Sequence, residues 1–401
     1  MNLPENVKFI IDRLNSRGYE AYAVGGCVRD HLLGKAPEDY DMTTSATPDE
    51  MKAVFSDLRV IETGIKHGTL TVLIDSVPHE ITTYRIDGEY TDNRHPSEVT
   101  FTRKLREDLA RRDFTVNAMA YSPRGGLADF FGGVDDLKKG VIRAVGDPML
   151  RFSEDALRIM RALRFSATLG FRIDDNTAEA VRAKKELLKN VSRERIYTEW
   201  KKLISGKDAY RVLTDYREVV EFVIPELSGY VLPDESRFLS APGDVRELSL
   251  FVTDPCDKTQ HFHALGRFSS AMYSLKTDTA HMESGLGAIG GLSCRTSKRT
   301  DVHELLVSEK EESRVEKIIR LKILLGTENE GALEILRDLI RENVCYKLSD
   351  LKINGNDLIA LGYKGKAIGD ELIKLLFLVA RGKIENEREA LLGAAEGVTK
   401  K

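Results

Sequence analysis

The sequence has few cysteines and no long apolar run, and both absences restrict what the protein can be. A membrane-spanning helix needs roughly 20 consecutive apolar residues, and no such stretch occurs in the 401 residues. The N-terminal segment MNLPENVKFIIDRLNSRGYE is charged and amphipathic, unlike a secretory signal peptide. These absences predict a cytoplasmic protein with no membrane partner.

The four cysteines lie far apart and form no C-x-x-C pair. We therefore expect neither a zinc site nor a disulfide framework. Cys27 lies near the first candidate site described below, and a small buried filler is the favoured interpretation for it.

No charge of one sign dominates the chain. Lys and Arg number 60 and Asp and Glu 64, so the formal net charge is −4. Proteins that bind RNA over a broad surface often carry a basic excess. Any RNA-binding face must therefore be local, and the net charge neither supports nor excludes one.

What the sequence does contain is a change of pattern near residue 140. Before it, apolar spacing predicts a helix over residues 5–17 that Gly18 ends. Period-2 alternation predicts strands at 69–75 and 79–86. A chain of this length holds two to four domains, and this part is predicted to be a small α/β head with a mixed sheet.

After that point the spacing is helical almost to the end of the chain. One helical stretch is expected to stop at Gly170. Residues 276–300 are rich in Gly, Ser and Thr and are predicted to form a loop or linker, and the polar residues 86–98 a mobile loop. The fold class is therefore an α/β head followed by an all-α region.

The first candidate site is the segment GGCVRDHLLGKAPEDYD, residues 25–41. Asp39 and Asp41 are two apart, so on a strand they share a face and can bind hard divalent cations. Gly25 and Gly26 stand between a predicted strand and a predicted helix, where backbone N–H groups can approach a phosphate. Arg29 adds charge for a triphosphate. The alternative is a surface D-x-D beside an ordinary glycine bend.

Glu80 lies in the predicted strand 79–86. If that strand neighbours the one carrying the aspartates, Glu80 completes a carboxylate triad. An exposed strand glutamate explains it equally well.

The second candidate site lies in LARRDFTVNAMAY, residues 109–121. Asp113 and Asn117 are four apart and would share a helix face. Their side chains can hydrogen-bond a ribose hydroxyl, while Arg112 can contact phosphate. A capped, charged helix start is the alternative.

The third candidate site lies in SEDALRIMRALRF, residues 153–165, with Ser153 as the expected N-cap. Asp155 and Arg158 are three apart on one helix face, and Arg161 extends it. Glu154 and Arg158 have the spacing of a helix ion pair. Ordinary surface ion pairing is the alternative.

A fixed Asp–Arg couple can read a base edge. The carboxylate accepts from an exocyclic amine, and the guanidinium donates to the adjacent ring nitrogen. Cytosine and adenine present that pair of groups, whereas uracil and guanine present a carbonyl in place of the amine. The pattern predicts selection of CTP and ATP over UTP and GTP.

Together these segments resemble the class II tRNA nucleotidyltransferases, which include CCA-adding enzymes and bacterial poly(A) polymerases within the polymerase-beta-like superfamily. The resemblance covers residues 20–206 and rests on GGCVRDHLLG with DYD, RRDFTVNAMAY, DFFGGVDDLKKGVIRAVGDP, EDALRIMRALRF and SRERIYTEWKKLISG, in the family's order.

The resemblance implies a role for each candidate residue. It implies that Asp39 and Asp41 bind metal, taken to be Mg²⁺, and that Glu80 is the third catalytic carboxylate. The nucleotide phosphates and ribose would be held by Gly25, Gly26, Arg29, Arg112, Asp113 and Asn117. Asp155 and Arg158 would template the base, with Arg161 and Arg164 supporting the nucleotide.

The resemblance also implies four parts. They are a head (1–140), a neck (141–206), a body (207–325) and a tail (326–401). Residues 352–389 resemble the tail that holds tRNA in the family, where Ile353, Leu358, Leu361 and Ile368 are expected in the core. No His-Asp pair marks the phosphohydrolase domain of some relatives, so His261 and His263 are interpreted as structural.

The predicted function is addition of CCA to tRNA 3′ ends from CTP and ATP, with pyrophosphate release. Tyr90, Asp92 and Arg94 resemble the loop of full CCA-adding enzymes and favour this over a CC-adding enzyme. The motifs also leave open an A-adding enzyme, a poly(A) polymerase and a non-catalytic RNA-binding protein.

Overall fold

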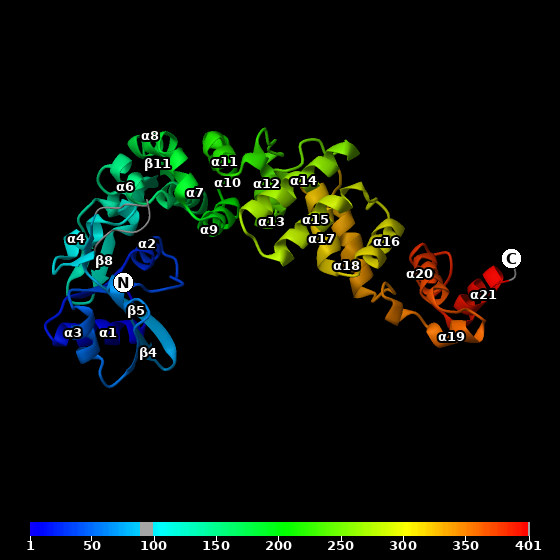
Figure 1. Cartoon of the computed structure of the whole chain (residues 1–401), viewed down its shortest axis with the longest axis horizontal. Helices are drawn as coiled ribbons and strands as arrows, with labels where there is room; N and C mark the ends of the chain where they lie inside the picture. Colours follow the sequence, from blue (N-terminus) through cyan, green and yellow to red (C-terminus); the bar gives the residue numbers. More distant parts are fainter. Residues whose placement is uncertain (89–98, 400–401) are drawn as a thin grey trace. The chain divides into compact units, whose positions relative to one another are not determined.

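The computed structural model describes residues 1–88 and 99–399 (Figure 1). The chain divides into two compact units, Met1–Val223 and Ile224–Lys401. The predicted loop residues Tyr90, Asp92 and Arg94 lie outside the described residues. The finer predicted boundaries at 140, 206 and 325 remain predictions.

The first unit is built on a mixed seven-stranded sheet in the order β3-β4-β5-β2-β1-β8-β9. Strands β2 and β5 are parallel, and the other neighbouring pairs are antiparallel. The predicted strand 79–86 ends at Thr83, and the chain then enters a separate hairpin. The strands of the sheet are β1 (Ala21–Val24), β2 (Met42–Thr44), β3 (Arg59–Ile61), β4 (Thr69–Ile74), β5 (Val77–Thr83), β8 (Met119–Ser122) and β9 (Gly126–Asp129); β6 (Arg85–Asp87) pairs with β7 (Val99–Phe101), and β10 (Val141–Ile142) with β11 (Arg172–Ile173).

Helix α1 (Glu5–Ser16) confirms the prediction for residues 5–17. Its apolar stripe is buried against one face of the sheet in a core that includes Met42 of β2 and Ile81 of β5. Gly18 follows with a φ of +87°, a conformation that costs a glycine little. A second cluster packs at β1 and β8 with α4 (Leu105–Ala110), through Val24, Tyr84, Leu105, Leu109 and Ala120.

The periodicity predicts one continuous helix in the stretch that follows, but the structure shows two. They are α6 (Pro148–Glu154) and α7 (Leu157–Leu169), with Asp155 between them at φ −132°. Asp147 caps α6, so Ser153 lies within a helix and the N-cap prediction for it is wrong. Gly170 ends α7 in the left-handed region, as predicted.

Seven further helices lie in the described part of the first unit, and α9 is the main partner of α7. They are α2 (Gly26–Leu32), α3 (Pro48–Val54), α5 (Gly133–Lys139), α8 (Asp175–Ala183), α9 (Arg193–Ile204), α10 (Ala209–Asp215) and α11 (Arg217–Val223).

The described part of the second unit is helical, as predicted. No helix among the described residues is both long and apolar enough to cross a membrane. Its helices are α12 (Glu235–Ser240), α13 (Gly243–Ser249), α14 (Lys258–Ser274), α15 (Thr279–Gly290), α16 (Arg299–Glu309), α17 (Glu312–Leu324), α18 (Gly331–Arg341), α19 (Gly355–Ala360), α20 (Lys366–Ala380) and α21 (Arg388–Thr399).

Residues 276–300 were predicted to be a loop, and this prediction is wrong. Twelve residues of the segment form α15, which Asp278 caps by accepting a hydrogen bond from the His281 backbone N–H. A Cβ atom on Gly285 would lie 2.3 Å from the ring of Phe268, so this glycine permits close helix packing.

The predicted tail core is confirmed, and the structural interpretation is supported for His261 but not for His263. Ile353 and Leu358 are buried, and Leu361 and Ile368 pack against the same cluster. His261 is buried, with Nε2 3.2 Å from the Pro255 carbonyl oxygen. His263 is exposed on the same helix.

Candidate active site

A pocket of about 450 Å³ in the first unit brings together residues from α2, the turn after α4, α7 and α9. It contains every predicted site residue except Asp39 and Glu80, and it adds four that sequence reasoning did not select. Its lining residues are Gly25, Gly26, Arg29, Asp41, Arg111, Arg112, Asp113, Asn117, Asp155, Leu157, Arg158, Arg161, Arg164, Phe165 and Arg195. A neighbouring pocket shares Gly26, Arg29, Asp41, Arg164 and Phe165 and includes Asp39.

Asp41 directly precedes β2, and its carbonyl oxygen accepts a hydrogen bond from the Val24 N–H at 2.9 Å. In the register of β2 and β5, Met42 pairs with Ile81. Extending that register by one residue aligns Asp41 with Glu80. Met42 and Ile81 point into the core, so Asp41 and Glu80 belong to the opposite face of the sheet.

The aspartates provide oxygen ligands of the kind that hard divalent cations prefer. Both are exposed and line the paired pockets, which suits a metal that must also meet substrate. Glu80 is exposed but lines neither pocket, and the described residues contain no group of three or more His, Cys, Asp or Glu arranged to hold a metal. The structure thus brings Asp39 and Asp41 to the site and leaves Glu80 aligned beside it.

The glycine turn and Arg29 form one wall of the pocket. Gly25 has a φ of +81°, and a Cβ atom there would lie 3.2 Å from Nη1 of Arg112. Arg29 is buried on α2 and donates through Nη1 to Oδ1 of Asn117 at 2.7 Å. Its Nε and Nη2 both donate to Asp30 at 2.9 Å. The guanidinium is therefore fixed where a phosphate would approach the turn.

Asp113 and Asn117 are adjacent, but not on the α-helix that was predicted. Asn117 lies in a 3₁₀ turn, Thr115–Asn117, and its Nδ2 donates to Oδ1 of Asp113 at 3.2 Å. Oδ1 also accepts from the Phe114 N–H at 2.8 Å, while Arg161 donates to Oδ2 through Nε at 2.7 Å and Nη2 at 2.6 Å.

These four bonds fill the acceptor capacity of the Asp113 carboxylate, which is about four lone pairs. Burial is the largest single effect and raises its pKa, but Arg161, Asn117 and Arg158 together outweigh it and lower the pKa of Asp113 to about 2. Asp113 therefore anchors the arginine of α7 instead of presenting a free carboxylate to a ribose.

Three arginines surround the ring of Phe165. The guanidinium carbons of Arg29, Arg161 and Arg164 lie 5.1, 5.3 and 3.6 Å from its centroid. Glu199 of α9 is buried and accepts from Nε of Arg164 at 2.8 Å. The aromatic face and the carboxylate hold a dense positive charge in place, as polyphosphate binding requires.

Asp155 and Arg158 lie where α6 gives way to α7. Oδ1 of Asp155 accepts from the Leu157 N–H at 3.1 Å, and Oδ2 lies 3.3 Å from Nη2 of Arg195. The first bond caps α7, and the second reaches the carboxylate from α9. Asp155 is thus held at the helix break with lone pairs still available to a base.

Arg158 is buried and firmly held. It donates through Nη1 to Glu154 at 3.0 Å, which confirms the predicted ion pair, and to the Arg151 carbonyl oxygen at 3.3 Å. Nη2 donates to the Arg111 carbonyl oxygen at 2.8 Å. Within the described part of the chain these bonds use three of the five N–H groups, which leaves donors for a base edge.

Sequence reasoning missed Arg111, Leu157, Phe165 and Arg195 as lining residues. Arg195 stands in the segment SRERIYTEWKKLISG, which resembled the family, but its spacing alone pointed to no partner. Cys27 is buried, as predicted, and burial raises the pKa of its thiol to about 11.

Comparison with known proteins identifies relatives that match nearly the whole chain. Residues 21–143 match the family model for the poly A polymerase head domain, and residues 269–395 match a model for tRNA nucleotidyltransferase domain 2. The chain is 37% identical to a CCA-adding enzyme of Leuconostoc mesenteroides, over 95% of this chain and 93% of that one. A CCA-adding enzyme of Enterococcus faecalis is 35% identical over 96% and 94%.

Solved structures give a matching result. The chain is similar to the crystal structure of the Bacillus stearothermophilus CCA-adding enzyme in complex with CTP, and the match covers 100% of this chain and 98% of that one. The TM-score is 0.80 and the sequence identity 29%.

Proposed function

This chain belongs to the CCA-adding enzyme family of tRNA nucleotidyltransferases, and we propose that it adds C, C and A in turn to the 3′ end of tRNA. The substrates are tRNA, CTP and ATP, and pyrophosphate is released. The observation that carries the proposal is one pocket that joins Asp41, a cluster of arginines and the fixed pair Asp155 and Arg158. Because the substrate is tRNA, we expect the enzyme to act in the cytoplasm.

Members of this family use a divalent metal, and we assign it to Asp39 and Asp41, with Mg²⁺ as the ion and Glu80 as the third carboxylate. When bound, the ion would lower the pKa of the attacking hydroxyl and neutralise charge on the phosphates. The alignment of Asp41 with Glu80 across β2 and β5 supports this carboxylate set.

The reaction needs little covalent chemistry from the protein. The tRNA 3′ hydroxyl loses its proton to solvent as its oxygen forms a bond to the α-phosphorus, and the bond from that phosphorus to the bridging oxygen of the β-phosphate breaks. Arg29, Arg161 and Arg164 stabilise the negative charge that moves onto the leaving pyrophosphate. Gly25 and Gly26 leave the backbone open to the phosphates, while Arg112 and Asn117 complete the wall beside them.

Base selection follows from the Asp155 and Arg158 pair. The carboxylate accepts from the amine of cytosine or adenine, and Arg158 donates to the neighbouring ring nitrogen. A uracil or guanine carbonyl would face the carboxylate with no proton between them. Leaving buried polar groups unpaired in this way is a strong basis for rejecting a substrate.

Three functions within the family and one outside it are less favoured. The relatives compared above are CCA-adding enzymes, and this chain matches them over nearly their whole length. This argues against a CC-adding enzyme, an A-adding enzyme or a poly(A) polymerase. A non-catalytic RNA-binding protein would have no need for the buried, hydrogen-bonded Asp113 and Arg158.

The test is extension of a tRNA that lacks its terminal CCA. The purified protein receives Mg²⁺ and each nucleotide singly, and then CTP together with ATP, and products are separated at single-nucleotide resolution. We expect growth by three residues that stops and that needs both nucleotides. Growth by two would identify a CC-adding enzyme, and an open-ended ladder with ATP alone a poly(A) polymerase. An Asp41→Ala variant that extends tRNA as fast as the native protein would refute the assigned metal site.

A further inference from the structure

Asp108 is a fully buried carboxylate near the end of α4 that does not line the nucleotide pocket. A buried charge is stable only when other groups compensate it. Arg111 donates to Oδ1 through Nε at 3.0 Å and Nη2 at 2.8 Å. Nη2 of Arg112 lies 3.5 Å from Oδ2. One carboxylate thus holds the two arginines that precede Asp113.

The same carboxylate reaches two other parts of the head. Oδ2 accepts from the Thr43 hydroxyl at 3.3 Å, and Oδ1 accepts from the Arg85 backbone N–H at 3.3 Å. Thr43 lies in β2, two residues after Asp41, and Arg85 begins β6. Asp108 therefore joins β2, the strand that follows the proposed metal ligand Asp41, to the turn that carries the arginines.

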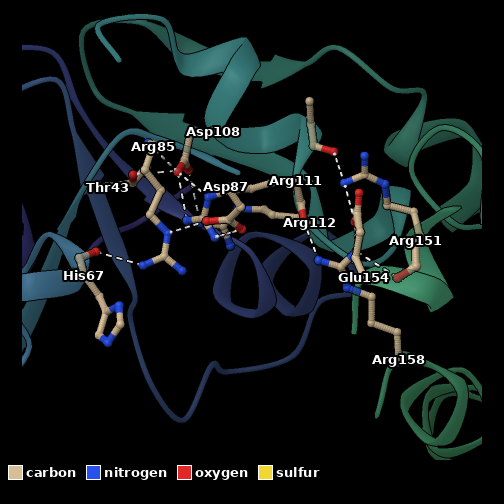
Figure 2. Close-up of polar contacts among 11 residues, drawn as sticks. Thr43, His67, Arg85, Asp87, Asp108, Arg111, Arg112, Arg151, Glu154 and Arg158 are labelled. Carbon is tan, nitrogen blue, oxygen red and sulfur yellow. Dashed lines mark hydrogen bonds and ion pairs between the residues drawn. The ribbon is translucent and has the colours of Figure 1, made fainter. Parts of the chain in front are cut away.

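Figure 2 shows how this cluster continues toward the base-reading arginine. The Arg111 side chain is held by Asp108 and lies 3.8 Å from Asp87 of β6. The Arg111 carbonyl oxygen accepts from Nη2 of Arg158 at 2.8 Å. Side chain and backbone of one residue thus connect the buried carboxylate to the guanidinium proposed to read the base.

A second hydrogen bond, to the carbonyl oxygen of the preceding residue, also joins this turn to α6. Arg151 donates to the Ala110 carbonyl oxygen at 3.4 Å, and Glu154 accepts from both Arg151 and Arg158 at 3.0 Å. The carbonyl groups at residues 110 and 111 therefore bind Arg151 of α6 and Arg158 of α7. Their position depends on how the end of α4 is held.

We propose that Asp108 is a positioning residue for nucleotide selection, which acts by fixing Arg111 and, through the Arg111 carbonyl oxygen, the donors of Arg158. The inference rests on the proposed base-reading role of Arg158. A clamp that only stabilised the head would affect the amount of folded protein but not the preference among nucleotides. Displacement of Arg158 should instead weaken the preference, since catalysis is sensitive to misplacement on the scale of about 1 Å.

The test compares Asp108→Asn with the native enzyme in single-nucleotide addition to tRNA lacking CCA. The substitution keeps the shape and removes the charge that holds Arg111. We expect the ratio of kcat/KM for CTP to that for UTP to fall about 10-fold, the size of effect that differential transition-state binding gives for a loosened contact. The matched control is Glu247→Gln, a buried carboxylate in the second unit that accepts from His281 at 2.9 Å. It should lower thermal stability and leave the ratio unchanged.

Two further variants separate the possible failures. Arg111→Met removes the link at its other end, so the double variant with Asp108→Asn should lose no more selectivity than the larger single effect. It also serves as the test if Asp108→Asn does not fold. If Arg158→Ala keeps full selectivity, the proposed function of the base-reading pair is wrong. If Arg158→Ala loses selectivity while Asp108→Asn and Arg111→Met both keep it, the role of Asp108 is refuted alone.

Discussion

Nη2 of Arg195 lies 3.3 Å from Oδ2 of Asp155, so the carboxylate proposed to read the base is held by a side chain from α9. Arg195 also lines the nucleotide pocket, and its Nη1 is buried with no hydrogen-bond partner among the described residues. A buried donor without a partner is costly unless something else occupies the site. The arrangement suits a guanidinium that both orients the carboxylate and meets the substrate.

We therefore predict that Arg195→Met lowers nucleotide selectivity. Without the guanidinium, Asp155 loses the partner that orients its Oδ2 atom. The ratio of kcat/KM for CTP to that for UTP should fall by about 10-fold, a loss of roughly one charge-assisted hydrogen bond. Steady-state incorporation of single nucleotides measures it. Arg193→Met is the control, because Arg193 lies on the same helix and donates to the Val223 carbonyl oxygen at 2.8 Å. Equal CTP-to-UTP ratios of kcat/KM in Arg195→Met and Arg193→Met would contradict the prediction.

Asp155→Asn should broaden the choice of nucleotide. A carboxylate only accepts hydrogen bonds, whereas an amide can turn either its oxygen or its NH₂ group toward the base. Incorporation of UTP relative to CTP should rise about 10- to 100-fold, the discrimination that a good pair of base contacts provides. Competition between the two nucleotides in one reaction gives the ratio directly. Asp175→Asn, an exposed carboxylate on α8, is the control, and a native ratio in Asp155→Asn would exclude the base-reading role.

Much of the site could be predicted because the chemistry demands particular residue types at short spacings. Asp39 and Asp41 were selected for a spacing of two on a strand, and both line the paired pockets although they precede β2 and neither lies in a strand. Gly25 needs only a left-handed turn before a helix. Glu154 and Arg158 have the four-residue spacing of a helix ion pair, and their 3.0 Å contact forms across the break at Asp155, between the end of α6 and the start of α7.

Features decided by single side chains were not visible in the periodicity. Apolar spacing continues through α6 and α7, because Phe152, Leu157 and Met160 are all buried on either side of the break. The break itself depends on Asp155, whose side chain caps the Leu157 N–H. Asp113 and Asn117 were expected on an α-helix because a spacing of four residues places two side chains on one helix face. In the structure a 3₁₀ turn brings the same two side chains together.

Tertiary contacts account for the other differences. Arg195 is 40 residues from Asp155 in the chain, and Asp108 is 65 residues from Thr43. Nothing in the local sequence joins them. Glycine content also misled the assignment of residues 276–300, where Gly291 allows close approach to Ile318, whose Cδ1 would lie 2.4 Å from an added Cβ atom.

The buried ion pair of Asp113 predicts a specific pH dependence of stability. Its pKa is lowered from the ordinary 3.8 to about 2, chiefly by Arg161 acting against the effect of burial. A lowered pKa stabilises the folded state above the ordinary value and loses that contribution as the pH falls from about 4 toward about 2. The shift corresponds to about 2 kcal/mol. Native protein should therefore exceed Asp113→Asn in thermal midpoint at pH 6, and the gap should narrow below pH 4. A gap that stays constant down to pH 3 would show that the charge contributes nothing.

A substitution at Gly206 can test whether the site requires close contact between α7 and α9. It follows α9, and a Cβ atom there would lie 2.6 Å from the carbonyl carbon of Ala167 and 2.7 Å from its oxygen. Gly206→Ala should therefore push apart the helices that carry Arg158 and Arg195. We expect a loss of about 1–3 kcal/mol, as for other overpacked cores, together with a lower kcat/KM for CTP.

Gly266→Ala is the matched control for that substitution. Gly266 lies within α14 and has no atom within 4 Å of an added Cβ. Alanine there should stabilise the protein by about 0.5–1 kcal/mol, because glycine loses more backbone freedom on folding. Thermal midpoints and CTP incorporation are measured for both variants. If Gly206→Ala is as stable and as active as Gly266→Ala, the neck helices can separate without cost, and the hydrogen bond from Arg195 to Asp155 cannot depend on their contact.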